Sequence, residues 1–249
     1  MRTLSIGNSF SEDACAYLHK AAASAGLELE TVNLYIGGCS LEYHAENLKE
    51  KRENYGLEIN GDYAGRQISI PEALAMGEYD FITLQQASHF SGKRETYFPH
   101  ITLLAEACRA AQPNARLMIH ETWAYETDST HGAFPDYGCD QRRMYELLRA
   151  AYCEAAQTVK AGIIPVGDTI QHFREHVPGF RYPESGESLC RDGFHLSIPT
   201  GRYLASLVWL ETLAGIDARE VTYLPEGMDE EKRVLVSGEV HRFLAGQAD

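Results

Sequence analysis

The stretch TLSIGNSFS (residues 3–11), near the start of the chain, decides the fold. Its apolar first half is typical of a β-strand, Gly7 ends that strand, and the polar turn leads into an amphipathic helix predicted over 11–25. Ser9 lies where the strand passes into the helix, and in an open α/β sheet this edge is where ligands bind. Serine is favoured at helix starts, and we expect Ser11 to cap this helix, which leaves the Ser9 hydroxyl free.

The composition is that of a chain with one sizeable core. It has 249 residues, 44% of them hydrophobic, and α/β folds of this length often form one domain, so we predict a single domain over 1–249. The formal net charge of −14 repels phosphate backbones, which excludes nucleic acid as a partner. Basic residues are scattered, with no polybasic run of the kind that binds a membrane surface.

The sequence carries no sign of a membrane span or of a metal site. No stretch approaches the roughly 20 apolar residues that cross a bilayer, and the N-terminus does not look like a signal peptide, so we expect a cytoplasmic protein. The six cysteines are widely spaced, without a Cys-x-x-Cys pair, which predicts neither zinc nor a disulfide framework. We predict no metal and no cofactor, and nothing in the sequence fixes the oligomeric state.

Segments of strand type alternate with helical segments along the chain. The predicted strands cover residues 3–7, 29–36, 79–84, 116–120 and 162–166. The main predicted helices cover residues 11–25, 99–112, 139–160, 168–176, 199–214 and 229–245. An Asn-Gly pair predicts a surface hairpin within 55–70. This alternation implies right-handed βαβ units, so we expect an α/β fold: a three-layer α/β/α sandwich around a flavodoxin-like parallel sheet of five strands, order 2-1-3-4-5.

Polar residues cluster after the C-terminal ends of the predicted strands. They are Ser9, Gly38, Gln85, Glu121 with Trp123, and, beyond the fifth strand, Asp192 with His195. In the predicted order these ends share one edge of the sheet, with the switch point between the first and third strands. We therefore expect residues that are distant in sequence to meet beside Ser9.

These residue types suggest nucleophilic chemistry. A serine hydroxyl is a weak nucleophile that needs a base within hydrogen-bond reach, and His195 is the predicted base. Asp192, three residues earlier, is predicted to orient the imidazole ring. The backbone N–H groups of Ser9 and Gly38 and the side-chain amide of Gln85 are the predicted donors to an oxyanion.

Structural interpretations of the same residues stay open. Asp192 and His195 precede a predicted helix and could simply form its entry, and Gln85 and Gln86 could satisfy backbone groups at the strand end. Trp123 and Tyr125 are predicted to form walls of the substrate pocket, although ordinary core packing would explain aromatic residues there equally well.

Three blocks of the sequence resemble the SGNH (GDSL-type) hydrolases. GNSF (residues 7–10) resembles the Gly-Asp-Ser-Leu block of that superfamily, and NLYIGG (33–38) resembles its second block, Asn-x-x-Ile-x-Gly. DGFH (192–195) matches its last block, Asp-x-x-His. The resemblance implies that Ser9 is the nucleophile, that Gly38 is an oxyanion donor, and that the last block supplies the orienting acid and the base.

The third block departs from the superfamily pattern. Where the SGNH hydrolases usually have Gly-x-Asn-Asp after the third strand, this chain has LQQAS (residues 84–88), as in a less-studied branch with Leu-Gln at that place. The asparagine of the superfamily donates to the oxyanion, and a glutamine can offer the same amide. Gln85, which directly ends the strand, is the favoured donor, with Gln86 as the alternative. Together with Trp123 and Glu121, Gln86 is also a predicted substrate-binding residue.

The resemblance implies a serine esterase with a Ser-His-Asp triad. The expected substrates are small acyl esters, acetyl esters of carbohydrates among them, so the expected partner is a small-molecule or carbohydrate ester. Two alternatives come from other classes of protein. One is a catalytically silent carbohydrate-binding protein on the same scaffold. The other is a flavodoxin-like module that binds a phosphate ligand, although Glu12 and Asp13 beside the first turn would repel phosphate.

Overall fold

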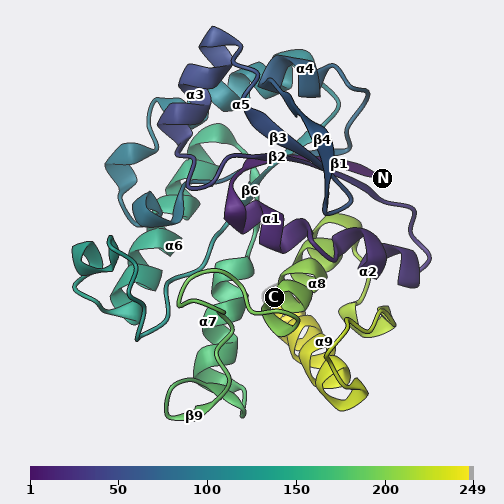
Figure 1. The fold of residues 1–249 in the computed structure, drawn as a ribbon, viewed down its shortest axis with the longest axis vertical. Helices are drawn as coiled ribbons and strands as arrows, with labels where there is room; N and C mark the ends of the chain where they lie inside the picture. The colour runs from purple at the N-terminus through teal and green to yellow at the C-terminus, as the bar shows by residue number, and fades with distance from the viewer. Residues whose placement is uncertain (247–249) are drawn as a thin grey trace.

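A seven-stranded sheet in the order β4-β3-β2-β1-β5-β6-β7 lies at the centre of the computed structural model, which describes residues 1–246 (Figure 1). Five of the strands are parallel: β1 (Arg2–Gly7), β2 (Glu30–Tyr35), β5 (Phe81–Leu84), β6 (Arg116–His120) and β7 (Gly162–Ile164). The predicted α/β class is confirmed, and the order 2-1-3-4-5 holds for these five strands.

The predicted count of five strands is wrong, because the hairpin joins the sheet. β3 (Tyr55–Ile59) and β4 (Asp62–Ile68) form the hairpin, and β3 pairs antiparallel with β2. Asn60 and Gly61 both have positive φ at its turn, a conformation that an Asn-Gly pair adopts readily. The hairpin covers the edge of β2, which would otherwise expose unpaired backbone groups.

Helices cover both faces of the sheet (Figure 1). One layer contains α1 (Ser9–Cys15), α2 (Leu18–Ser24), α8 (Thr200–Ala214) and α9 (Glu230–Ala245), with α7 (Val166–His176) against α8 and α9. The other layer contains α3 (Leu41–Glu50), α4 (Ile70–Leu74), α5 (His100–Ala111) and α6 (Gln141–Val159). A two-stranded ribbon, β8 (Phe180–Arg181) with β9 (Ser185–Gly186), lies outside the sheet. No helix within residues 1–246 has the length and apolar character needed to cross a bilayer.

The first helix begins earlier than predicted and is broken in two. Asn8, not Ser11, is the N-cap: its Oδ1 accepts the Phe10 N–H at 3.0 Å, and the Ser11 hydroxyl accepts the Asn8 N–H at 3.1 Å. The break at residues 16–17 lies against the hairpin turn, where a Cβ on Gly61 would come within 2.9 Å of the Ala16 carbonyl oxygen. Ser9 is therefore the first residue of α1, and its side chain takes no part in the cap.

Candidate active site

Three residues predicted to act together lie in one hydrogen-bonded line. His195 Nε2 is 2.9 Å from Ser9 Oγ, and His195 Nδ1 is 2.7 Å from Asp192 Oδ2. The backbone N–H of His195 also donates to Asp192 Oδ1, at 2.8 Å. An ionised carboxylate only accepts hydrogen bonds, so Nδ1 carries the imidazole proton and Nε2 is free to accept the Ser9 hydroxyl proton.

The electrostatics of Asp192 fit this arrangement. Partial burial works against its charged form, but hydrogen bonds from the His195 ring and backbone and from the Phe194 N–H outweigh burial and hold the Asp192 pKa below its ordinary value. Asp192 therefore stays ionised at neutral pH and accepts the hydrogen bond from His195 Nδ1.

A buried carboxylate on α1 anchors the loop that carries His195. Asp13 is fully buried and accepts hydrogen bonds from Arg191 Nη1 at 2.9 and 3.0 Å, from Arg202 Nε at 2.8 Å, and from the Leu196 N–H at 2.8 Å. Because Ser9 is on the same short helix, this carboxylate fixes the loop relative to the serine.

The turn after β2 faces the same site. Gly38 has φ +64°, a left-handed conformation that glycine adopts without strain. Asn8 Nδ2 donates to the Cys39 carbonyl oxygen at 3.1 Å, which connects this turn to the residue before Ser9. Within residues 1–246, the backbone N–H groups of Ser9 and Gly38 donate no hydrogen bond, so both remain available to a ligand.

The two glutamines after β5 do not line the pocket. Gln85 is 1% exposed: its Nε2 donates to Asn8 Oδ1 at 2.8 Å, and its Oε1 accepts from His120 Nδ1 at 2.6 Å. Gln86 is fully buried: its Oε1 accepts the Leu41 N–H and its Nε2 donates to Thr96. Gln86 thus satisfies backbone groups, as its structural interpretation expected, whereas the amide of Gln85 is held by two side chains and orients the turn before Ser9.

Trp123 and Glu121, both predicted to bind substrate, are buried in the structure. Trp123 is fully buried, stacks on Phe10 with ring centroids 4.3 Å apart, and donates from Nε1 to the Phe194 carbonyl oxygen at 2.7 Å. Glu121 is 2% exposed, and burial, with a contribution from nearby Asp168, raises the pKa of its carboxyl well above the ordinary value. Core packing is thus the role of Trp123, because Phe10 lies between its ring and the cleft.

A pocket of about 450 Å³ opens in front of Ser9. Its lining residues are Ser9, Phe10, Tyr35, Gly37, Gly38, Ser88, His89, His131, Phe194 and His195. Of these, the sequence interpretation assigned no site role to Tyr35, Ser88, His89, His131 or Phe194. Tyr35 is the last residue of β2, and Ser88 and His89 follow β5, so position near a strand end was the available signal for these three. For His131 the signal was its place in residues 126–137, a polar stretch of unusual length for a loop.

The orientation of His131 gives the pocket a further donor. The Ala133 N–H donates to His131 Nδ1 at 3.1 Å, so in the neutral ring Nε2 carries the proton. Burial, together with the charge of His195, lowers the His131 pKa, which favours that neutral form. The ring is held between those of Tyr125 and Phe194, at 4.6 and 4.8 Å between centroids.

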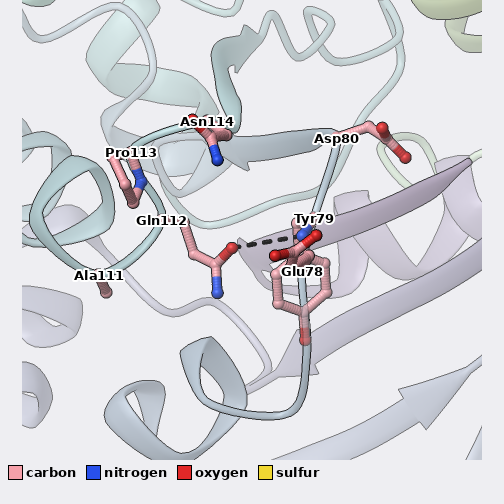
Figure 2. Close-up of a pocket in the computed structure, with 7 residues that line it drawn as sticks. All are labelled: Glu78, Tyr79, Asp80, Ala111, Gln112, Pro113 and Asn114. Carbon is pink, nitrogen blue, oxygen red and sulfur yellow. Dashed lines mark hydrogen bonds between the residues drawn. The ribbon is translucent and has the colours of Figure 1, made fainter.

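A second cavity, of about 510 Å³, lies at the opposite edge of the sheet (Figure 2). It is lined by residues that precede β5 and β6, namely Glu78, Tyr79, Asp80, Ala111, Gln112, Pro113 and Asn114. Gln112 Oε1 accepts the Tyr79 N–H there, at 3.3 Å. The amino ends of the strands bring no nucleophile and base together in this cavity, so its size does not make it the stronger candidate.

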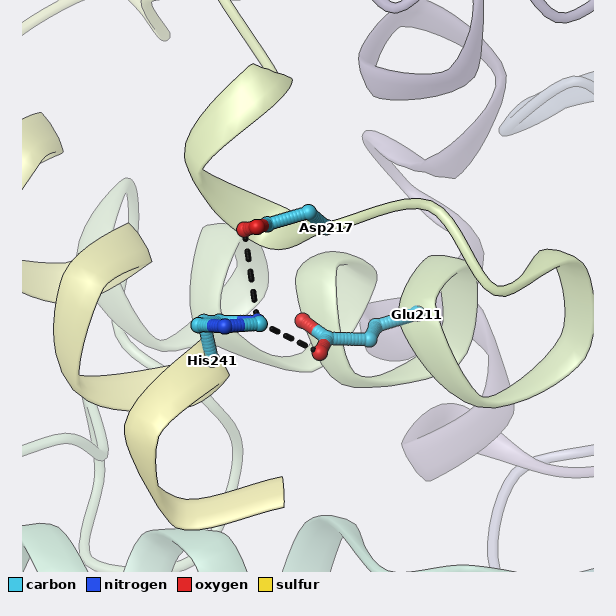
Figure 3. Close-up of side chains that lie close together, drawn as sticks. All are labelled: Glu211, Asp217 and His241. Carbon is cyan, nitrogen blue, oxygen red and sulfur yellow. Dashed lines mark hydrogen bonds and ion pairs between the residues drawn. The ribbon is translucent and has the colours of Figure 1, made fainter. Parts of the chain in front are cut away.

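Glu211, Asp217 and His241 form a compact cluster away from the pocket (Figure 3). Their ligand-type atoms lie within 4.8 Å of one another. His241 Nδ1 is 2.8 Å from Glu211 Oε1 and 3.3 Å from Asp217 Oδ1, and Arg219 binds both oxygens of Asp217. These interactions occupy the atoms that a metal ion would bind, so hydrogen bonding between α8 and α9 accounts for the cluster.

Comparisons with known proteins agree with this architecture. The family model described as a domain of unknown function, DUF4886, matches residues 2–241. A crystal structure of a DUF4886 family protein from Bacteroides uniformis shares 34% identity with a TM-score of 0.91, over 100% of this chain and 96% of that one. The comparison with curated proteins found no match.

Two further solved structures connect the fold to the SGNH hydrolases. A candidate SGNH hydrolase from Slackia heliotrinireducens shares 27% identity with a TM-score of 0.60, over 86% of this chain and 99% of that one. An acetylxylan esterase from Geobacillus stearothermophilus shares 13% identity with a TM-score of 0.53, over 86% and 94%. The chain therefore has the fold of the SGNH hydrolases.

Proposed function

The chain belongs to the DUF4886 family, and we propose that it is a serine esterase with Ser9 as its nucleophile. The observation that carries the proposal is the placement of His195 between Ser9 and Asp192, with hydrogen bonds of 2.9 and 2.7 Å. A nucleophile, a base and an orienting carboxylate in this order are the parts that serine acyl transfer requires.

The first half of the reaction forms an acyl-enzyme. Ser9 Oγ attacks the ester carbon and its proton passes to His195 Nε2, while the carbonyl π electrons move onto the carbonyl oxygen. The N–H groups of Ser9 and Gly38 stabilise that oxyanion. The intermediate collapses by breaking the carbon–oxygen bond to the alcohol, which leaves with the proton from His195.

Water completes the cycle by the same route. His195 Nε2 takes a proton from a water molecule, the hydroxide formed attacks the acyl carbon, and the Ser9 oxygen leaves and recovers the proton. The acyl group is released as a carboxylic acid, and the Ser9 hydroxyl and the neutral imidazole of His195 are restored, so water is the one co-reactant in the balance.

The substrates we propose are small acyl esters, with acetylated carbohydrates as the leading class. The pocket combines the aromatic rings of Tyr35 and Phe194 with hydrogen-bonding groups such as His131, a mixture that suits a sugar ring better than a long alkyl chain. The fold shared with an acetylxylan esterase supports the same class.

Hydrolysis of p-nitrophenyl acetate by the wild type and by Ser9→Ala tests the proposal. We expect turnover by the wild type and a loss of about 10⁴-fold or more in Ser9→Ala. Ser24→Ala is the matched control, because the Ser24 hydroxyl donates to Ala21 far from the pocket. A panel of acetylated sugars and p-nitrophenyl esters of increasing length then measures the preference for short acyl groups. Equal hydrolysis by the wild type and Ser9→Ala would reject the esterase.

One observation favours a second candidate function, that of a carbohydrate-binding protein without catalytic activity. The amide of Gln85, expected to hold the oxyanion, is buried away from the pocket. The candidate predicts binding of sugars without turnover, and the same panel with calorimetry separates the two functions.

A further inference from the structure

The loop after β5 brings one side-chain hydroxyl into the pocket. Ser88 opens the short helix η1 (Ser88–Phe90) and lines the pocket together with Ser9 and Gly38. It is 8% exposed, and its Oγ lies 2.9 Å from the hydroxyl of the fully buried Tyr125. Gln85 and Gln86, in the same loop, are bonded within the protein interior, so Ser88 is the side chain of this loop that offers a hydroxyl to a ligand.

The direction of the hydrogen bond between the two hydroxyls follows from what each can otherwise do. Among the described residues, Ser88 Oγ is the one hydrogen-bond partner of the Tyr125 hydroxyl. A buried donor left without an acceptor costs about 1–3 kcal/mol, so the Tyr125 proton is directed to Ser88 Oγ. Burial raises the Tyr125 pKa, which keeps that proton in place at physiological pH.

The hydroxyl proton of Ser88 then has no hydrogen-bond acceptor among the described residues. Within residues 1–246 the Ser88 hydroxyl has no acceptor other than Tyr125, whose own proton already occupies the bond. The proton can therefore turn toward the pocket, where it is a preorganised donor because its oxygen is held by the phenol.

The neighbouring His89 also lines the pocket, but it is not preorganised in the same way. Its ring packs on Phe90, with centroids 4.2 Å apart, and no hydrogen bond from a described residue fixes it.

We propose that Ser88 is the third oxyanion donor, with Tyr125 as the residue that positions and polarises it. The inference rests on the proposed esterase function of Ser9. As Ser9 Oγ bonds to the acyl carbon and its proton passes to His195, the negative charge on the former carbonyl oxygen is held by the N–H groups of Ser9 and Gly38 and by the Ser88 hydroxyl. Ser88 donates a hydrogen bond throughout and transfers no proton.

Ser88→Ala, Tyr125→Phe and the double variant test this assignment, with p-nitrophenyl acetate as substrate. We expect Ser88→Ala to lower kcat by about 10²- to 10³-fold, with KM almost unchanged, because the oxyanion is present in the transition states of acylation and deacylation and absent from the bound ester. Tyr125→Phe should lower kcat by about 10-fold, and the double variant should be no slower than Ser88→Ala.

Ser91→Ala is the matched control. The Ser91 side chain is buried one turn away, and its hydroxyl donates to the Ser88 carbonyl oxygen at 2.8 Å rather than into the pocket. Its kcat should stay within about threefold of the wild type. Loss in Ser91→Ala as large as in Ser88→Ala would show that the loop fold matters and not the Ser88 hydroxyl, and would overturn the assignment.

Ser88→Thr and Ser88→Val provide a second comparison if the alanine variant does not fold. The two side chains share a shape and differ in the hydroxyl, so kcat of the valine variant should be lower than that of the threonine variant by about 10²- to 10³-fold. Equal kcat in both would contradict the assignment.

Labelling by a fluorophosphonate distinguishes failure of this inference from failure of the proposed function. If the wild type hydrolyses the ester and is labelled at Ser9 while Ser88→Ala retains full kcat, the Ser88 assignment is wrong and the esterase stands. If the wild type neither turns over nor is labelled, both are wrong, because no oxyanion is formed.

Discussion

Two histidine–carboxylate clusters in this molecule look alike and are placed to do different things. His195 and His241 each bring Nδ1 within hydrogen-bond distance of a carboxylate, at 2.7 Å to Asp192 and 2.8 Å to Glu211. The second nitrogen of His195 continues to Ser9 Oγ, at the wall of a pocket. Nδ1 of His241 is instead shared with a second carboxylate, Asp217, between two helices (Figure 3).

The difference shows that a paired histidine is not in itself a sign of catalysis. What separates the two clusters is the atom at the other end of the imidazole and its access to a ligand. His195 can pass a proton between a hydroxyl and a bound ester, whereas His241 can only strengthen the contact between α8 and α9.

Replacing each histidine by alanine tests the difference between the two clusters with the largest expected effect. His195→Ala should lower kcat for p-nitrophenyl acetate by about 10⁴- to 10⁶-fold, because Ser9 loses its base. His241→Ala should leave kcat unchanged and lower the midpoint of thermal unfolding by a few degrees, as expected for about 1 kcal/mol of lost hydrogen bonding. Comparable losses of kcat in the two variants would contradict the separation of roles.

Replacing a carboxylate should lower kcat in the His195 cluster and leave kcat unchanged in the His241 cluster. Asp192→Asn replaces an acceptor with an amide that no longer stabilises the imidazolium of His195, and we expect kcat to fall by about 10²- to 10⁴-fold. Asp217→Asn is the matched control and should retain wild-type kcat. Steady-state kinetics with both variants, after circular dichroism has shown that they fold, measures the contrast. Full activity in Asp192→Asn would remove Asp192 from the site.

Replacing Asp13 tests whether its bonds to the loop that carries His195 are needed for activity. Asp13→Asn weakens the bonds to Arg191 and Arg202 and loosens the loop that carries His195. We expect kcat to fall by about 10- to 100-fold, since small displacements of catalytic groups are costly. Labelling of Ser9 by a fluorophosphonate should slow in proportion, whereas loss of stability alone would leave the labelling rate of the folded protein unchanged.

Glu58 lies behind the site and should affect stability, not turnover. It accepts a hydrogen bond from Asn33 at 2.7 Å, and burial raises its pKa to about 7. Between pH 4.5 and about 7 the unfolded chain releases this proton while the folded protein keeps it, so the free energy of unfolding should fall with rising pH, by up to about 3 kcal/mol.

Urea denaturation of the wild type and Glu58→Gln across this pH range measures the effect. The glutamine cannot ionise, so the variant should show a shallower decline than the wild type between pH 4.5 and 7. Identical pH dependence in both proteins would show that Glu58 titrates normally.

Much of the fold was accessible from the sequence, because strand ends and helix periods are local features. The alternation of strands and helices correctly predicted a parallel sheet, and the flavodoxin-like order expected for it holds for the five parallel strands. The attachment of β3 to β2 was missed, since nothing local says which strand an Asn-Gly hairpin will pair with. The start of α1 was also misplaced, because Asn8 and Ser11 are both good capping residues and only their mutual hydrogen bonds decide between them.

The site was predictable in sequence position but not in side-chain direction. Ser9 follows the end of β1, whereas Asp192 and His195 lie beyond α7 and the β8–β9 ribbon, and the structure brings the three side chains together. Gln85 and Trp123 follow strand ends too, yet both turn inward: His120 and Asn8 bind the amide of Gln85, and Phe10 covers Trp123. Which side a residue faces just beyond a strand depends on partners from other segments, and those partners are known only once the chain is folded.

Mass spectrometry of the fluorophosphonate-treated protein tests the central claim most directly. We predict that the wild type carries one adduct, on the peptide that contains Ser9, and that His195→Ala labels far more slowly under the same conditions. His241→Ala should label at the wild-type rate. Absence of an adduct on that peptide in the folded wild type, or equal labelling rates in His195→Ala and the wild type, would contradict an activated Ser9.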